Sequence, residues 1–306
     1  MLVDYIQANT NGRLHPAHEP SLSPLNRGFL YGDAVYEVWR SYHGVLFAWD
    51  EHWRRLERSA TALNMPVAFT QERIFSEILR TAEAYLKTTG KQDIDLYVRL
   101  QLTQGSDTIG LDSALADKPE FVLLVQPNPH LSVEKLRDGL KLSLAMQLRR
   151  NPAASLNPAW KTGNYLNNIL CLREARDRGA DEVAITNLNG DIAEAAVCNL
   201  GFFRDDTFVT PPLDAGILGG ITRGLVLGQI AQEAGFKPVE EVVRPGELDR
   251  FQECCLLSTT KDIAPVSAID AIRFHIAPDS RVMRLKTTFA SYTRAYASAR
   301  PELRIT

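Results

Sequence analysis

Apolar and polar residues alternate along the first 125 positions in patterns that change between strand and helix. Residues 36–42 and 45–47 have the short apolar runs of two strands joined by a tight turn, which predicts a hairpin. Over 50–63, apolar residues recur every three or four positions, as they do on one face of a helix. Residues 96–102 alternate like a half-buried strand, and residues 121–125 are apolar throughout, which is typical of a buried strand.

The second half of the chain has a similar mixture of patterns. A strand is expected over 141–146, and an amphipathic helix over 164–178 with Gly179 placed to end it. A further helix is expected over 222–234. The remaining predicted strands are 182–187, 198–203 and 254–257. Strands and helices interleaved in this way predict an α/β or α+β fold.

The clearest break between these patterns is the Pro-Asn-Pro run at 127–129, because proline fixes the backbone and lacks an N–H donor. A chain of 306 residues also exceeds the usual size of one domain. We therefore expect a small N-terminal α/β domain over 1–125, a linker over 126–134 and a larger C-terminal domain over 135–306.

The composition is that of a soluble globular protein, with 45% hydrophobic and 23% charged residues. The net charge of −3 and the lack of a basic block argue against nucleic acid as a partner. The longest apolar runs are strand-sized, so no membrane span is expected. The first residues lack the basic segment of a secretory signal, which makes the cytoplasm the expected location. The histidines and four cysteines show no metal-binding spacing, and Cys254 and Cys255 are expected to be buried thiols.

The most informative candidate for chemistry is Lys161, just before the helix predicted over 164–178. Downstream lie an acid, Glu194, and two turns rich in N–H and hydroxyl donors, at 219–222 and 258–260. An amine, a carboxylate and two anion-binding turns are the groups that a phosphorylated pyridine aldehyde needs from a protein. Each feature alone also has an ordinary explanation, such as a solvated lysine, a surface acid or a threonine-capped glycine turn.

Six motifs in a fixed order carry a resemblance that spans nearly the whole chain. They are residues 26–37, 52–56, 161–167, 190–194, 217–223 and 258–260. On these motifs the chain resembles the class IV (fold type IV) pyridoxal-phosphate aminotransferases, a family of branched-chain aminotransferases, D-amino-acid transaminases, (R)-amine transaminases and aminodeoxychorismate lyase. The resemblance implies a two-domain fold type IV enzyme of the α/β (α+β) class, with pyridoxal 5′-phosphate as cofactor, that forms a homodimer.

By this resemblance, Lys161 forms the Schiff base, and its amine moves the proton between the substrate α-carbon and cofactor C4′ once substrate displaces it. Glu194 would pair with the pyridine nitrogen, and Tyr165 would hydrogen-bond the phenolic oxygen. Further residues would hold the phosphate, pack on the ring or support the site. These are Arg55, Asn199, Leu218, Gly220, Ile221, Thr222 and Thr260. From helical position alone Arg55 would be expected in solvent, since it lies about 100° from the apolar stripe of its helix.

For the substrate, the resemblance points to tyrosines and arginines on the first hairpin and on the strand over 96–102. The substrate-binding residues that it implies are Tyr31, Tyr36, Arg40, Tyr97, Arg99 and Thr259. A substrate carboxylate can pair with Arg40 or Arg99, although both arginines can equally be structural. At the positions of the Arg-x-His carboxylate trap of D-amino-acid transaminases the chain has Ile109 and Leu111, neither of which can bind a carboxylate.

The first motif points toward the D-specific enzymes, and two further positions depart from patterns of the family. The run at 36–38 resembles their first motif more than the Phe-Glu-Gly of branched-chain enzymes, and Val38 should narrow the pocket where glycine would leave room. Gln104 also departs from the Thr-Arg-Gly turn seen across much of the family. The Gly-Cys-Phe-Thr-like run of the lyase is absent.

We therefore expect a transaminase that acts on an aliphatic amino acid, branched-chain first, and on a 2-oxo acid such as 2-oxoglutarate. D-amino-acid or (R)-amine transamination is the second hypothesis, and aminodeoxychorismate lyase the third. The alternative from another class is a catalytically silent binding protein on the same fold, which the intact Lys161 and Glu194 argue against.

Overall fold

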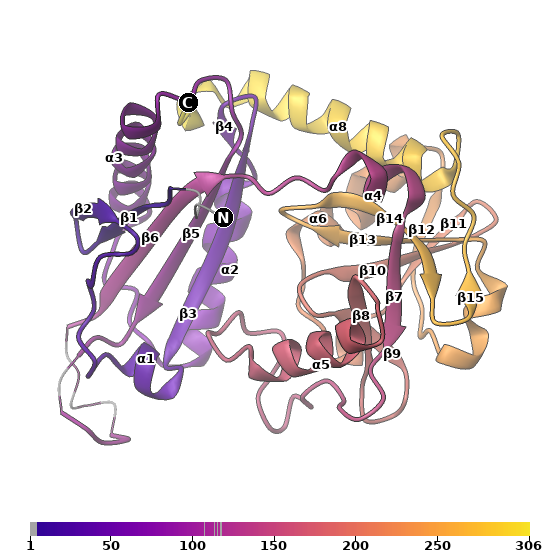
Figure 1. Ribbon diagram of the computed structural model, residues 1–306, viewed down its shortest axis with the longest axis horizontal. Coiled ribbons are helices and arrows are strands. Elements are labelled where there is room, and N and C mark those ends of the chain that lie inside the picture. Colours follow the sequence, from indigo (N-terminus) through magenta and orange to yellow (C-terminus); the bar gives the residue numbers. More distant parts are fainter. Residues whose placement is uncertain (1–4, 107, 113, 115, 117) are drawn as a thin grey trace. The chain divides into compact units, whose positions relative to one another are not determined.

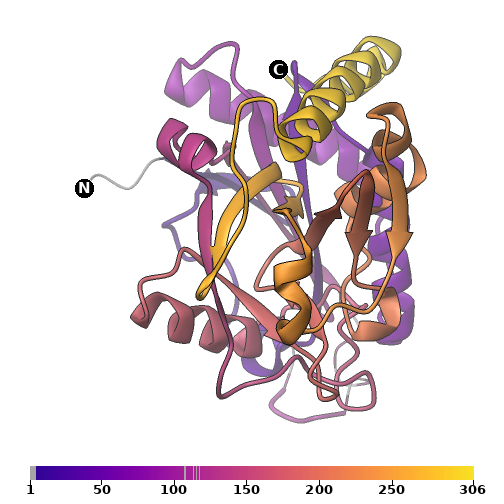
Figure 2. The same cartoon turned by 90° about the vertical axis from the view of Figure 1, so that its right-hand side faces the viewer.

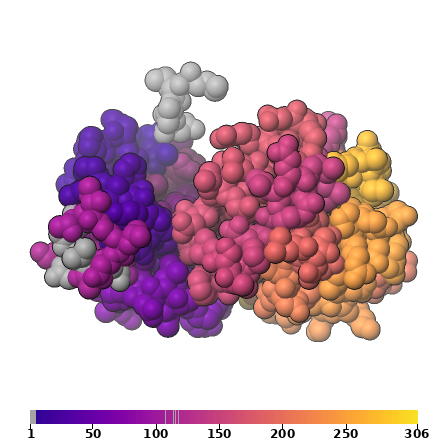
Figure 3. Space-filling view, turned by 90° about the horizontal axis from the view of Figure 1, so that it is seen from below, coloured from indigo at the N-terminus to yellow at the C-terminus, as the bar shows by residue number. Residues whose placement is uncertain are grey.

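The computed structural model describes residues 5–106, 108–112, 114, 116 and 118–306. The chain forms two units (Figure 1). The first unit comprises Met1–Pro129, Trp160–Asn164 and Thr293–Thr306. The second comprises His130–Ala159 and Tyr165–Tyr292, whose surface appears mainly in magenta to yellow in Figure 3.

A six-stranded antiparallel sheet with strand order β2-β1-β6-β5-β3-β4 forms the centre of the first unit. Its strands are β1 (Gln7–Thr10), β2 (Arg13–Pro16), β3 (Ala34–Tyr42), β4 (Val45–Leu46), β5 (Leu96–Thr103) and β6 (Glu120–Pro127). The helices of this unit are α1 (Arg27–Tyr31), α2 (Trp49–Ala62), α3 (Gln71–Thr89), the 3₁₀ helix η5 (Pro301–Leu303) and the end of α8 (Arg281–Ala299).

The alternation of β5 gives this sheet one apolar and one polar face. Its even-numbered residues from Leu96 to Leu102 are buried in a core that α2 and α3 complete, whereas Tyr97, Arg99 and Gln101 are partly exposed on the other face. Burying each large apolar side chain contributes about 1.5–3 kcal/mol to stability. The face with Tyr97 and Arg99 therefore carries polar and aromatic side chains that stay partly exposed.

A nine-stranded mixed sheet forms the second unit (Figure 2). Its order is β12-β11-β10-β13-β14-β7-β8-β9, with β15 paired to β14. The strands are β7 (Leu140–Leu144), β8 (Glu182–Thr186), β9 (Ile192–Ala195), β10 (Asn199–Arg204), β11 (Thr207–Thr210), β12 (Lys237–Glu240), β13 (Glu253–Ser258), β14 (Asp262–Ile269) and β15 (Ile272–Arg273). The helices are α4 (Val133–Asp138), α5 (Leu166–Asp177), η2 (Leu213–Ala215), α6 (Ile221–Leu225), the π-helical η3 (Val226–Ile230), α7 (Ala231–Glu233), η4 (Pro245–Arg250) and the first part of α8.

The structure confirms the hairpin and the other predicted strands within a few residues. The helix expected over 50–63 is α2, and the helix expected over 164–178 is α5, with Gly179 following at a φ of 79°. The helix expected over 222–234 is continuous through α6, η3 and α7, but its middle turn is π-helical. Cys254 and Cys255 are fully buried, as expected.

The two units differ from the domains expected from the sequence, which assigned all residues after 134 to one domain. Residues 160–164 belong to the first unit, because Tyr36 N donates to Lys161 O at 3.0 Å and Gly163 N donates to Ala34 O at 2.9 Å. The C-terminal residues also return to it, where Ile305 N donates to Gly44 O at 2.8 Å. The expected linker over 126–134 is partly regular, since β6 continues to residue 127 and α4 begins at residue 133.

Candidate active site

The candidate residues fall into two sets, one in each unit. In the first unit, hydrogen bonds fix the backbone of Lys161 on both sides. Lys161 N donates to Ser59 Oγ at 3.1 Å, and Lys161 O accepts from Tyr36 N at 3.0 Å. These contacts fix the backbone from which the side-chain amine of Lys161 extends.

The ring of Tyr36 contacts two cationic groups. Lys161 Nζ lies 4.3 Å from the ring centroid, and Arg99 Cζ lies 3.8 Å from it. A cation over an aromatic ring is attracted by about 0.5–1 kcal/mol or more when water is excluded, and Tyr36 is buried. The predicted Schiff-base amine and one of the two candidate carboxylate-binding arginines therefore share one aromatic side chain.

The two arginines on the polar face of the sheet differ in their charge environment. Arg40 lies 3.4 Å from a carboxylate oxygen of Asp95, and its guanidinium stacks 4.2 Å from the ring of Tyr42. Arg99 donates to the neutral amide oxygen of Gln101 at 3.1 Å. In the described part of the chain, no carboxylate lies within ion-pair distance of Arg99. The charge of Arg40 is thus balanced by an acid of its own unit, and that of Arg99 is not.

Arg55 is buried on α2, which corrects the solvent-exposed position expected from its place on the helix. It is paired with Glu37 of β3, whose carboxylate accepts from Arg55 Nε at 2.6 Å and from Arg55 Nη2 at 2.8 Å. The same carboxylate accepts from His52 Nδ1 at 2.8 Å. All three side chains are buried. Burial of an arginine becomes possible here because a fully hydrogen-bonded carboxylate balances its charge.

The protonation states of this cluster follow from its surroundings. Burial opposes ionisation of Glu37, but the Arg55 guanidinium and His52 hold the pKa of its carboxyl well below the usual value of 4.5. Burial lowers the pKa of His52 below its usual value of 6.5, and the neighbouring Arg55 and Lys161 add to this effect. The cluster is therefore one cation, one anion and a neutral imidazole at neutral pH.

This neutral histidine makes the fold sensitive to acid. The unfolded chain binds a proton at His52 below pH 6.5, whereas the folded chain does not, so stability falls as pH drops below 6.5. By pH 5 the loss from this one group is at most about 2 kcal/mol. Urea denaturation at pH 7 and pH 5 should show a smaller loss for His52→Gln than for wild type, by up to that amount. An equal loss in both proteins would contradict the assignment of a neutral, buried His52.

The other two residues of the first unit that are expected at the substrate are Tyr31 and Tyr97. Tyr31 is on α1, and its hydroxyl accepts from Gly110 N at 3.1 Å. Tyr97 lies on the polar face of β5, opposite Arg40 in the register of β3 and β5. Ile109 and Leu111 are strongly exposed.

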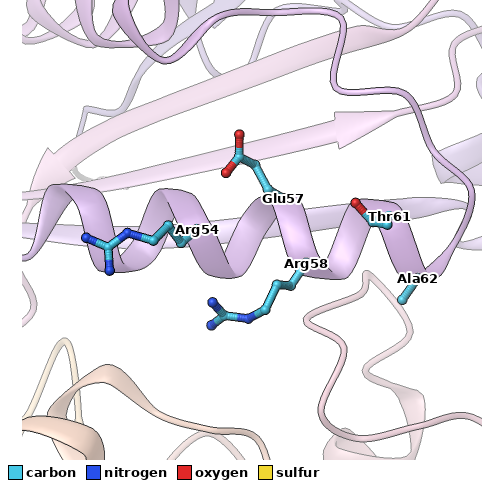
Figure 4. A pocket seen from close by; sticks show the side chains of 5 residues that line it. All are labelled: Arg54, Glu57, Arg58, Thr61 and Ala62. Carbon is cyan, nitrogen blue, oxygen red and sulfur yellow. The ribbon is translucent and has the colours of Figure 1, made fainter.

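A hollow of about 460 Å³ on the solvent-facing side of α2 contains none of the expected site residues (Figure 4). Its lining residues are Arg54, Glu57, Arg58, Thr61 and Ala62.

In the second unit, Glu194 lies on β9 and is almost fully buried. Its Oε1 is 2.6 Å from Arg150 Nη2, and its Oε2 accepts from Asn199 Nδ2 and from Leu218 N, both at 3.1 Å. Asn199 Nδ2 also donates to Leu218 O at 2.9 Å. The structure thus places Glu194, Asn199 and Leu218 together, with the Arg150 guanidinium paired to the same carboxylate.

Arg150 was missed by the sequence analysis. It is buried and donates to Asn168 Oδ1 of α5 at 2.8 Å, while Asn168 Nδ2 donates to Ala196 O at 2.7 Å. No motif marked this arginine, because its partner Glu194 is 44 positions away in the sequence. The only available signal was an arginine in a loop before the Lys161 segment, which is too common to be informative.

Gly220 precedes the first turn of α6 and is tightly enclosed. A Cβ at this position would lie 2.0 Å from Asn199 Oδ1, so a side chain cannot be accommodated without displacing Asn199. No side chain caps this helix start within the described part of the chain, and Thr222 is buried in its first turn. Backbone N–H groups at a helix start favour an anion.

The remaining predicted residues of this unit lie at the ends of regular elements. Tyr165 is the residue before α5. Thr259 and Thr260 form the turn between β13 and β14, where Lys261 N donates to Ser258 Oγ at 3.1 Å. Both threonines are partly exposed.

The donor and acceptor chemistry of the two sets fits pyridoxal phosphate. In the second unit, Glu194 is a carboxylate suited to a protonated ring nitrogen, and the helix start at Gly220 suits an anion. In the first unit, the buried cation Arg55 suits a phosphate. Lys161 supplies an amine on a fixed backbone.

A metal site has no comparable support, because no group of three potential ligands occurs among the described residues. None of the helices in the described part of the chain has the length and apolar character that crossing a bilayer requires.

Comparisons with known proteins agree with these chemical groups. Residues 34–269 match the family model of amino-transferase class IV. The chain is 34% identical over 260 residues to a putative branched-chain-amino-acid aminotransferase of Methanocaldococcus jannaschii. The aligned region covers 85% of this chain and 86% of that protein. It is 30% identical over 260 residues to D-alanine aminotransferase of Bacillus licheniformis, covering 85% and 87%.

Solved structures of branched-chain aminotransferases have a similar fold. The branched-chain aminotransferase of the thermophilic archaeon Thermoproteus uzoniensis, solved with norvaline, superimposes with a TM-score of 0.84, at 26% identity and with coverage of 97% of this chain and 98% of that one. A further solved branched-chain amino acid aminotransferase contains pyridoxamine 5′-phosphate and superimposes with a TM-score of 0.83, at 25% identity and 97% coverage of both chains.

The chain therefore belongs to the class IV aminotransferase family. It is a pyridoxal-phosphate-dependent transferase with the mixed α/β, two-sheet fold of that family. The family and the fold class expected from the sequence motifs are confirmed.

Proposed function

We propose that this protein transfers the amino group of an aliphatic amino acid, branched-chain first, to a 2-oxo acid such as 2-oxoglutarate. When bound, pyridoxal phosphate withdraws electrons from the substrate α-carbon and carries the amino group between donor and acceptor. Lys161 forms the covalent link to the cofactor in the resting enzyme and moves the proton at the α-carbon. Glu194 keeps the ring nitrogen protonated.

The other cofactor contacts follow from the same proposal. Tyr165 hydrogen-bonds the phenolic oxygen, Leu218 packs against the ring, and Asn199 orients Glu194. The phosphate is held by Arg55, Gly220, Ile221, Thr222 and Thr260. The enclosed helix start at Gly220 and the buried charge of Arg55 support these assignments.

The single observation that carries the substrate class is the pair of cations at Tyr36. Arg99, whose charge no carboxylate of the described chain balances, contacts the same ring as the amine of Lys161. A substrate carboxylate at Arg99 would place the α-carbon of an amino acid near the reacting amine. Tyr31, Arg40, Tyr97 and Thr259 complete the substrate residues that we propose, with Arg40 supporting Tyr97 from the neighbouring strand.

Arg99→Gln tests this role. We expect kcat/KM for L-leucine to fall about 10- to 100-fold, because a hydrogen bond to a charged group is worth about 1.5–3 kcal/mol. Any reaction with (R)-1-phenylethylamine should be unaffected, since that amine has no carboxylate. Steady-state kinetics with both substrates measure the difference. Equal losses for both would show that Arg99 is structural.

A panel of single half-reactions distinguishes the substrate hypotheses. L-leucine, L-valine, D-alanine and (R)-1-phenylethylamine are each mixed with the cofactor-loaded enzyme, and the loss of its visible absorbance is followed. We expect fast conversion with the two L-amino acids. Conversion confined to D-alanine or the (R)-amine would overturn the branched-chain assignment, and pyruvate release from aminodeoxychorismate would indicate the lyase.

One observation favours D-amino-acid transamination as a second candidate. Val38 lies opposite Arg99 in the register of β3 and β5, so its branched side chain occupies the polar face beside the candidate carboxylate-binding group. This narrows the space for a large aliphatic substrate. The similarity to a D-alanine aminotransferase also supports this second candidate.

We also propose a homodimer in the cytoplasm. Leu166, Ile169 and Leu170 on α5 are exposed apolar side chains, which supports an interface on the second unit. All four cysteines are buried thiols, and none forms a disulfide, which is compatible with a reducing compartment.

A further inference from the structure

We propose that Glu37 and His52 are positioning residues that orient Arg55 for the cofactor phosphate. This inference rests on the proposed role of Arg55 in pyridoxal-phosphate binding. It assigns a function to two buried polar residues to which the proposed reaction gives no role.

The hydrogen bonds of Glu37 fix the plane of the Arg55 guanidinium. The carboxylate takes the side-on pair of donors, Nε at 2.6 Å and Nη2 at 2.8 Å. A guanidinium has five N–H groups in one plane, so this pairing sets the direction of the end-on pair formed by Nη1 and Nη2. Two parallel N–H groups at a fixed orientation match two oxygens of a phosphate.

His52 fixes Glu37 in turn. Its Nδ1 donates to Glu37 Oε2 at 2.8 Å, and the two groups lie on different elements, α2 and β3. Because the imidazole is neutral, it acts as a hydrogen-bond donor without adding a charge that would repel Arg55. The carboxylate consequently has donors at both oxygens and cannot rotate without losing one of them.

The cluster is also connected to Lys161 through the same helix turn. Ser59 Oγ donates to Arg55 O at 3.0 Å and accepts from Lys161 N at 3.1 Å. Tyr36, the neighbour of Glu37 on β3, donates its N–H to Lys161 O at 3.0 Å. Two short series of bonds, one through Ser59 and one through β3, therefore connect the proposed phosphate-binding arginine with the proposed Schiff-base lysine. Such a connection is expected if both residues hold the same small molecule.

The test compares pyridoxal phosphate with pyridoxal, which lacks the phosphate. Apo-protein is titrated with each compound, and the visible absorbance of the lysine-bound form gives the two dissociation constants. For Glu37→Gln we expect affinity for pyridoxal phosphate to fall about 10-fold or more, as for loss of a well-oriented charged hydrogen bond. Affinity for pyridoxal should change by less than about twofold. Equal weakening of both compounds, or no change in either, would overturn the proposal.

A double-mutant cycle shows whether Glu37 acts through Arg55. In an Arg55→Gln background, Glu37→Gln should have no further effect on the ratio of the two affinities, because the group that it orients is gone. An undiminished effect in that background would refute the positioning role.

Glu37→Gln leaves the charge of Arg55 buried without its counter-ion, and this can unfold the protein. His52→Phe provides the second variant, since it removes the Nδ1 hydrogen bond but keeps a planar ring. We expect it to weaken pyridoxal phosphate about threefold relative to pyridoxal. An unchanged ratio in a folded His52→Phe protein would also overturn the proposal.

Failure of this inference and failure of the proposed function are distinguishable in the same titrations. If wild-type protein develops no visible band with either compound, the proposed function fails. If wild type binds both compounds and the variants keep the wild-type ratio, only the positioning role of Glu37 and His52 fails.

Discussion

Replacing Lys161 with alanine lowers kcat for transamination by more than about 10³-fold, because the change removes both the nucleophile and the group that moves the α-proton. The fold should survive. The Lys161 backbone is held through Ser59 Oγ and Tyr36 N, and neither hydrogen bond uses the side chain. The change removes the contact between Nζ and the Tyr36 ring, which is worth about 0.5–1 kcal/mol. Turnover of L-leucine with 2-oxoglutarate, together with a denaturation curve, measures both effects.

Lys161→Arg is the matched control for charge. Arginine keeps a cation near Tyr36 but cannot act as a nucleophile or base at neutral pH, because its guanidinium stays protonated. We expect it to be as inactive as the alanine variant. Substantial turnover in either protein would remove Lys161 from the reaction.

Glu194→Gln should lower kcat by about 10²- to 10³-fold, the usual effect of removing one preorganised electrostatic group. Glutamine has nearly the same shape but no negative charge, so it cannot stabilise a protonated ring nitrogen. The substitution also leaves the buried Arg150 without its counter-ion, which should destabilise the second unit by about 3 kcal/mol. Activity within about threefold of wild type would contradict the proposed role of Glu194.

The double variant Glu194→Gln/Arg150→Met separates the two effects. Removing both charges should restore most of the stability, because no buried charge then lacks a partner. Activity should stay low, since the carboxylate is still missing. Recovery of both stability and activity would mean that Glu194 acts only as a structural partner of Arg150.

Local patterns predicted most of the elements. The alternation over 96–102 and the apolar run over 121–125 place β5 and β6, because side chains on strands follow a period of two. The same rules could not place residues 160–164. This segment joins the first unit through hydrogen bonds to β3, more than 120 positions earlier in the sequence, and no local pattern encodes that pairing.

Long-range charge pairing explains what the sequence could not show of the site. Arg55 lies off the apolar stripe of α2, and its burial depends on Glu37, which is contributed by another element. Arg150 is hidden for the same reason, because only the folded chain brings it to Glu194. The motifs predicted roles for Lys161 and Glu194, whereas the charge partners Glu37 and Arg150 became visible only in the folded chain.

Chemical trapping shows directly whether Lys161 holds the cofactor covalently. Sodium borohydride reduces the link between a lysine amine and an aldehyde to a stable bond, so protein incubated with pyridoxal phosphate can be reduced, digested and mapped by mass spectrometry. We expect a single modified peptide, with the pyridoxyl phosphate group on Lys161, and none in Lys161→Ala. An unmodified protein, or modification at a different lysine, would contradict this expectation.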